Sequence, residues 1–167
     1  MTSQLIPAGP FDPPGVVWAP VSPRLAAVRL SIAGIVLGVP LVGGVVAALL
    51  SGVTWLWVIP GVFVVLGLWA AWLIPRQVRA VGYAERADDL LIRRGILFRS
   101  MVVVPYGRMQ YVDVQAGPLA RWFGIAAVQL HTASTGTDAV IDGLPPTEAT
   151  RLRDKLASRG EARLAGL

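Results

Sequence analysis

Two long apolar stretches dominate the first half of the chain. Residues 30–50 contain Ser31 as their only polar side chain, and residues 55–74 contain no ionisable one. Each stretch is long enough for one helical crossing of a bilayer. One continuous helix through both would be about 69 Å long, more than twice the thickness of a hydrocarbon core of about 30 Å. The chain therefore turns at residues 51–54, and the pattern predicts a transmembrane helical hairpin over residues 25–75.

Arginines flank this hairpin only at its open end. Two precede the first apolar stretch, two follow the second, and the turn has none: they are Arg24, Arg29, Arg76 and Arg79. Basic residues concentrate on the cytoplasmic side of membrane proteins. We therefore expect a multi-pass protein of the cell membrane with both termini in the cytoplasm. Tryptophans at both ends of the second stretch fit interfacial belts; they are Trp55, Trp57, Trp69 and Trp72.

Small residues in the first apolar stretch are spaced for close helix contact. Gly34 and Gly38 form a GxxxG pattern, which lets two helix backbones approach. Two interpretations stay open: these glycines contact a partner helix, or they pack the first helix of the hairpin against the second. The absence of ionisable residues from both stretches argues against a transporter or channel.

The first 24 residues differ from the rest in their proline content. Residues 1–23 contain six prolines and one charge, so neither a helical nor an alternating period is sustained. The order of features found in a secretory signal peptide is not present. We expect residues 1–24 to be a Pro-rich disordered cytoplasmic tail.

After the hairpin, short apolar runs separated by Gly and Pro predict a mainly β domain over residues 76–160, followed by a flexible tail at 161–167. Strands are expected at Leu90–Ile92, Ile96–Phe98, Met101–Val104, Tyr111–Val114, Ile125–Leu130 and Ala139–Ile141. For the first hairpin, a three-residue turn at residues 93–95 places the apolar side chains on one face. That face would hold Leu90, Ile92, Ile96 and Phe98.

One helix is expected at the end of this domain. Thr147 is placed to cap it and Gly160 to stop it, and an apolar stripe recurs at Ala149, Leu152 and Leu156. Its other side is basic, which suits a membrane-surface or nucleic-acid role as well as a solvated face. Because acidic residues interrupt the basic side, we interpret the helix as one that closes the β core.

The composition of the chain leaves few residues for the common kinds of catalytic or metal site. The chain is 54% hydrophobic and 15% charged with net charge +5, and it has no Cys and one His, His131. Thiol nucleophiles, disulfides and thiolate metal sites are therefore excluded. Alternation in residues 126–131 turns His131 outward or onto a half-covered face, and we interpret it as a surface residue and not as a metal ligand or base. We expect no enzyme activity, cofactor or metal, and no nucleic-acid or small-molecule substrate.

The order of these elements carries a resemblance. Two spans, then LLIRRGILFR, VPYGRMQYVDVQAGPLARWFG, an apolar strand, IDGLPP and a final helix resemble the bacterial pleckstrin-homology-like (PH-like) membrane proteins of the YdbS type over residues 25–158. The resemblance implies that residues 76–160 form a seven-stranded sandwich or open barrel with one C-terminal helix.

Two functions follow from these features. In the first, the domain is an interaction module that assembles an envelope complex with a protein partner or a second copy. In the second, it recognises anionic lipid head groups at the cytoplasmic leaflet. The residues available to either function are Arg93, Arg94, Arg99, Arg121 and Trp122, with Gly34 and Gly38 for helix contact. Trp122 is nevertheless expected to be buried, because a small sandwich has few large side chains for its core.

Overall fold

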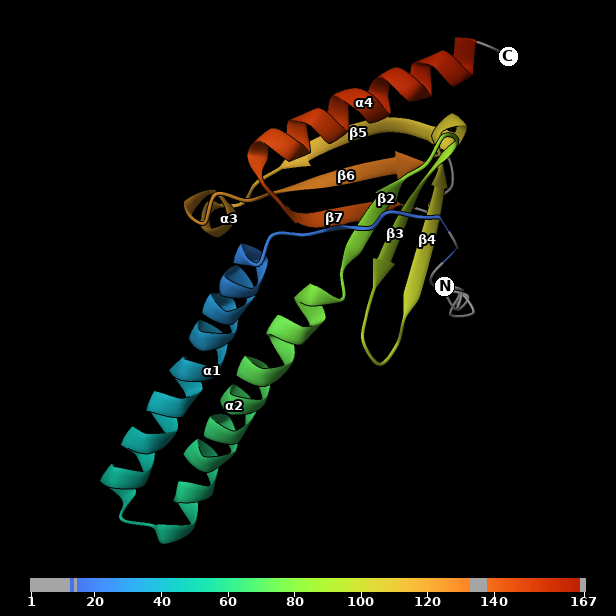
Figure 1. The fold of residues 1–167 in the computed structure, drawn as a ribbon. Coiled ribbons are helices and arrows are strands. Elements are labelled where there is room, and N and C mark those ends of the chain that lie inside the picture. Colours follow the sequence, from blue (N-terminus) through green and yellow to red (C-terminus); the bar gives the residue numbers. More distant parts are fainter. Residues whose placement is uncertain (1–12, 14, 133–137, 166–167) are drawn as a thin grey trace, which may run out of the picture.

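The computed structural model of the chain describes residues 13, 15–132 and 138–165 (Figure 1). Its helices are α1 (Arg24–Ser51), α2 (Val58–Arg79), α3 (Pro118–Trp122) and α4 (Pro146–Ala165), with 3₁₀ turns at Thr54–Trp57 and Tyr106–Arg108. Its strands are β1 (Ala19–Pro20), β2 (Gly82–Glu85), β3 (Asp89–Arg94), β4 (Ser100–Pro105), β5 (Met109–Gln115), β6 (Ala126–Thr132) and β7 (Ala139–Leu144).

The hairpin of α1 and α2 projects from the β domain as a separate antiparallel pair (Figure 1). Only 11% and 6% of the most apolar windows of the two helices are buried, so neither is the core helix of a soluble fold. Gly52, with φ of +63°, caps α1 at the turn, where a residue with a side chain would be strained. The predicted hairpin of two long apolar helices is confirmed, and both helices are long and apolar enough to cross a membrane.

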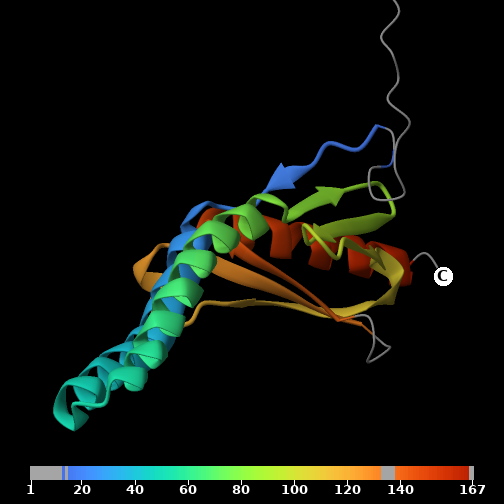
Figure 2. The same cartoon turned by 90° about the horizontal axis from the view of Figure 1, so that it is seen from below.

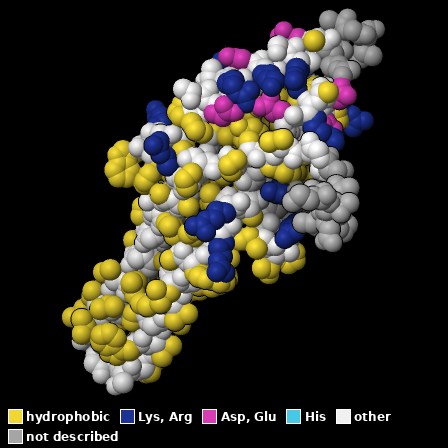
Figure 3. Space-filling model, viewed as in Figure 1, with side chains coloured by type: hydrophobic (Ala, Val, Ile, Leu, Met, Phe, Trp, Pro, Cys, Tyr) yellow, Lys and Arg dark blue, Asp and Glu magenta, His cyan; other side chains and the backbone are white. Residues whose placement is uncertain are grey.

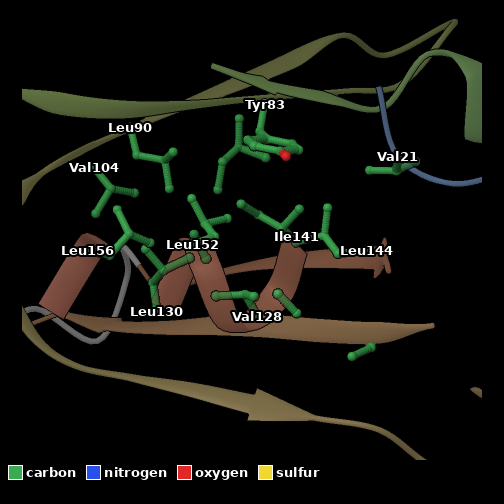
Figure 4. Packing of buried hydrophobic residues seen from close by; sticks show 14 of the residues in the cluster. Val21, Tyr83, Leu90, Val104, Val128, Leu130, Ile141, Leu144, Leu152 and Leu156 are labelled. Carbon is green, nitrogen blue, oxygen red and sulfur yellow. The ribbon is translucent and has the colours of Figure 1, made fainter. Parts of the chain in front are cut away.

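The β domain consists of two antiparallel sheets, ordered β1-β2-β3-β4 and β5-β6-β7, with α4 packed against them. Seen from below, the sheets lie on opposite sides of α4 (Figure 2). Side chains from both sheets and from α4 point toward one another in the core (Figure 4). They include Tyr83, Leu90, Val104, Val128, Leu130, Ile141, Leu152 and Leu156. The predicted mainly β sandwich and the apolar stripe of its final helix are confirmed.

The segment before the hairpin belongs to this domain. Ala19 pairs with Tyr83, Val21 is buried, and the Ser22 amide donates to the Gly143 carbonyl at 2.8 Å. The prediction of a disordered tail over residues 1–24 is therefore wrong for residues 19–24, while residues 1–12 and 14 lie outside the described part. A Pro-containing segment can add to a sheet at its edge, where one side of the strand needs no ladder. The hairpin is thus inserted between β1 and β2.

The predicted turn between β3 and β4 is wrong. Arg94 pairs with Ser100 and Ile92 with Val102, so residues 95–99 form a five-residue loop and Ile96–Phe98 is not a strand. Gly95 lies in this loop with φ of +89°. The observed register pairs the six residues of β3 with the six of β4. A three-residue turn would have paired β3 with residues 96–98 in place of the apolar run Met101–Val104.

The final helix is longer than predicted. Gly160 does not stop it, and α4 continues to Ala165, so residues 161–165 are helical where a flexible tail was expected. Gly160 is buried, and a Cβ at this position would lie 3.8 Å from the Tyr106 carbonyl oxygen. The glycine therefore sits where the helix passes close to another backbone segment, and it is not a C-cap.

Candidate functional site

The helices of the hairpin are seated directly on the β domain. Leu25 in the first turn of α1 is buried, and a Cβ on Gly143, which has φ of +80°, would lie 2.8 Å from the Leu25 Cβ. Arg29 pairs with Asp142 at 3.6 Å, and Val78 near the end of α2 is part of the core. These contacts fix the direction of the hairpin relative to the domain.

Arginines surround this junction. The Arg76 guanidinium lies 3.7 Å from the centre of the Trp72 ring, and Arg93 lies 4.5 Å from that of Trp18. In the space-filling view, dark-blue side chains gather between the apolar hairpin and the domain, while the acidic side chains visible from this side lie near α4 (Figure 3). On this face, the hairpin end of the domain is therefore mainly basic.

The loop between β3 and β4, residues 95–99, carries exposed apolar side chains at this same end. Leu97 is 83% and Phe98 89% exposed. The loop extends from the domain on the side from which the hairpin projects (Figure 1). Arg94 precedes it and Arg99 ends it, and within the part of the chain that the structure describes no carboxylate pairs with either. Arg94 and Arg99, two of the predicted contact residues, thus flank an exposed apolar loop tip. This tip was missed at the level of the sequence because Ile96–Phe98 was assigned to a strand.

The short helix α3 presents an exposed tryptophan beside the start of α1. Trp122 is 79% exposed, so its predicted burial is wrong. Phe123, whose ring meets that of Trp122 edge-on at 5.0 Å, packs against the core instead. One helical turn cannot direct adjacent side chains to the same side, and Phe123 takes the inner position. Arg121 is exposed next to Trp122.

A groove of about 360 Å³ runs between α1 and α2 on one side of the hairpin. Gly34 and Gly38 line it with apolar residues of both helices, including Gly67. A Cβ on either glycine would meet nothing within 4 Å, whereas one on Gly44 would lie 3.1 Å from Ile59. Gly44 therefore makes the close contact inside the hairpin, and the GxxxG pair faces an open groove.

The opposite end of the domain is rich in paired charges. Arg151 of α4 donates to Glu85 at 2.5 Å and to both carboxylate oxygens of Glu148, Lys155 lies 2.6 Å from Glu85, and Tyr83 donates to Glu148 at 2.8 Å. Burial raises the pKa of the Glu85 carboxyl, but hydrogen bonds from Arg151 and Lys155 outweigh it and the pKa is lowered. The hydrogen bond from Arg151 likewise lowers the pKa of Glu148. Basic residues of α4 thus join it to β2, in agreement with a helix that closes the core.

His131 is half-buried on β6, as the alternation predicts. Its ring stacks on Tyr111 with centres 4.2 Å apart, and its Nδ1 lies 3.2 Å from an Asp138 oxygen. Among the residues that the structure describes, no group of three or more His, Asp or Glu side chains is arranged to hold a metal ion.

Comparison with known proteins agrees with this architecture. The family described as Bacterial PH domain matches residues 16–160. UPF0699 transmembrane protein YdbS of Bacillus subtilis (strain 168) is 36% identical over 75 residues, which are 45% of this chain and 46% of that protein. The chain thus matches about half the length of this relative. No solved structure matches the chain. The resemblance inferred from the sequence is confirmed.

Proposed function

Since the chain belongs to the bacterial PH domain family, we propose that it is a non-enzymatic membrane protein whose domain and hairpin together form an assembly module of the cell envelope. In this proposal the hairpin crosses the membrane twice. Both termini and the PH-like domain lie in the cytoplasm, as the four arginines at the open end of the hairpin favour.

The observation that carries the proposal is the open groove between α1 and α2. Helices associate in lipid through close packing and not through a hydrophobic driving force, so small residues are what a helix-binding surface needs. Gly34, Gly38 and Gly67 line the groove without any neighbour for a Cβ at these positions. A transmembrane helix of the partner, from another membrane protein or from a second copy, is the occupant that we propose.

Trp122 supports the same function outside the membrane. Exposed tryptophans are frequent anchors of protein interfaces, and this one adjoins Arg121 on α3, which contacts α1. One partner could therefore contact the groove with its membrane helix and α3 with its cytoplasmic part. Trp122 is mostly exposed and does not belong to the buried core. A Trp122→Ala variant should therefore stay folded, and a loss of partner binding would report on the interface itself.

The groove is tested by filling it in the full chain. A photoreactive residue at Leu37, which lines the groove, should form an adduct with a protein in native membranes, and Gly38→Leu should abolish it. Gly43→Leu is the matched control, because Gly43 lies on the same helix, has open space at its Cβ and does not line the groove. The adduct mass separates a second copy from another protein. Adducts with lipid alone would contradict the proposal.

The orientation is tested independently with reporter fusions. Alkaline phosphatase inserted at Gly52 should be active, and the same enzyme fused after Leu167 should be inactive, because it folds only outside the cytoplasm. The reverse pattern would contradict the orientation and leave the groove hypothesis intact.

A further inference from the structure

The loop of residues 95–99 is the feature that an assembly module of this kind does not explain. Leu97 and Phe98 are adjacent, large and almost fully exposed. Both lie at the end of a β-hairpin, where neighbouring elements offer no cover. Exposed apolar clusters in water are unfavourable and mark contact surfaces.

The fold holds this loop on the membrane side of the domain. The loop and the hairpin extend from the domain in the same general direction (Figure 1). Leu25 of α1 and Val78 of α2 belong to the domain core, and Arg29 pairs with Asp142, so the hairpin cannot turn freely relative to the loop. These contacts therefore determine the position of the loop along the membrane normal.

The charges around the loop match the surface of an anionic leaflet. Arg94 and Arg99 stand on either side of the apolar tip, and the acidic side chains visible in the space-filling view lie near α4, away from the hairpin (Figure 3). Apolar side chains flanked by Arg are the composition that binds at a membrane interface, where the rings and alkyl groups enter and the guanidinium groups stay with the head groups. Arg76 and Trp72 form a similar pair at the end of α2.

We propose that the loop of residues 95–99 is a second membrane anchor, which inserts Leu97 and Phe98 into the leaflet that holds the arginine-flanked helix ends. Arg94 and Arg99 contact the anionic head groups of that leaflet. This anchor holds whether or not the groove of the hairpin takes a partner helix. It fixes the rotation of the domain about the hairpin axis, and with it the direction in which the groove and Trp122 face.

The absence of Cys from the chain makes a direct test available. An environment-sensitive fluorophore is attached to Phe98→Cys in the full chain, reconstituted in vesicles of phosphatidylcholine and phosphatidylglycerol. Ser158→Cys is the control, because Ser158 is exposed on α4 at the other end of the domain. We expect lipids with brominated acyl chains to quench the label at position 98 and a water-soluble quencher to lose most of its effect there. The label at position 158 should behave in the opposite way.

Three results would overturn the proposal. A label at position 98 as accessible to the aqueous quencher as the one at position 158 places the loop in water. A label shielded from water but not quenched by brominated lipid places the loop against protein. Since Phe98 itself is replaced, Leu97→Cys repeats the measurement with the ring present, and disagreement between the two positions would also count against insertion.

A charge variant tests the contact with head groups. In the Phe98→Cys chain, Arg94→Gln combined with Arg99→Gln should reduce quenching by brominated lipid, and vesicles of phosphatidylcholine alone should reduce it in the same way. Arg153→Gln is the control, because Arg153 lies on α4 and pairs with Asp154 at 2.7 Å. Unchanged quenching in the double variant would refute the role of the two arginines.

Discussion

Basic residues gather at both ends of the PH-like domain, but their surroundings differ. At the α4 end, Arg151 lies between Glu85 and Glu148, and Lys155 reaches Glu85 as well. At the hairpin end, Arg94 and Arg99 border two exposed apolar side chains, with no carboxylate paired to them among the residues described. The first group holds elements of the fold together, and the second faces outward.

This comparison explains why the net charge of +5 is a poor guide to function. Much of the basic side of α4, which by composition alone suits a membrane surface, is neutralised by carboxylates of β2 and of the helix itself. The arginines near the hairpin, such as Arg94 and Arg99, instead border an exposed apolar loop on the side from which the hairpin projects (Figure 1). Position relative to the hairpin, and not the number of charges, separates the two roles.

The largest effect on stability is expected from a substitution in the hydrophobic core between the hairpin end and the α4 end of the domain. Leu156 is 1% exposed on α4, so Leu156→Asp buries a charge among apolar side chains and should lower the free energy of unfolding by several kcal/mol. Ser158→Asp, two residues along on the exposed side, should be nearly neutral. Thermal unfolding of the two variants in detergent, with protease resistance of the domain, measures the difference. A Leu156→Asp variant that melts like its parent would contradict the assigned core.

A smaller effect is expected where the hairpin meets the domain. Gly143→Ala places a Cβ at positive φ and within 2.8 Å of Leu25, which should cost about 1–3 kcal/mol. Gly117→Ala is the control, because Gly117 has φ of −67° and open space at its Cβ. Equal melting temperatures for the two variants would show that the junction is looser than the contact with Leu25 indicates.

The elements that could be predicted from the sequence are those defined by their own composition or period. The two apolar stretches are long enough to define spans, and the alternation in β6 and the stripe Ala149, Leu152 and Leu156 define buried faces. Each of these signals is local, so no knowledge of the partner element is needed.

The errors occurred where a distant segment decides the outcome. β1 has only two residues and exists because β2, more than sixty residues later, pairs with it. Two segments are apolar enough to form the strand after β3, namely Ile96–Phe98 and Met101–Val104. Only the register of pairing with β3 determines which of them does so. Trp122 is a residue type that favours burial, but Phe123 occupies the inner position. The exposed loop of residues 95–99 could not be predicted, because its apolar residues fit a strand equally well.

A still smaller effect on stability is expected from the paired charges at the α4 end. Arg151 is partly exposed, so Arg151→Gln should cost only about 1 kcal/mol at neutral pH. The folded-state pKa values of Glu85 and Glu148 are lowered, so their contribution is complete above the unfolded pKa of about 4.3 and is lost as the pH falls through the folded value. The difference in melting temperature between variant and parent should therefore shrink below about pH 4. A difference that stays constant would contradict the network.

The smallest effect on stability is expected at the hairpin end, from Arg94→Gln combined with Arg99→Gln. Both residues stand at the edge of an exposed loop, and neither has a paired carboxylate in the part of the chain that the structure describes. Substitutions on such a surface change the free energy of unfolding by about 0.5 kcal/mol at most. The double variant should thus have the same melting temperature as its parent in detergent, where no anionic leaflet is present. A loss of stability as large as that of Arg151→Gln would mean that these arginines hold the fold together as well, and the distinction between the two ends would disappear.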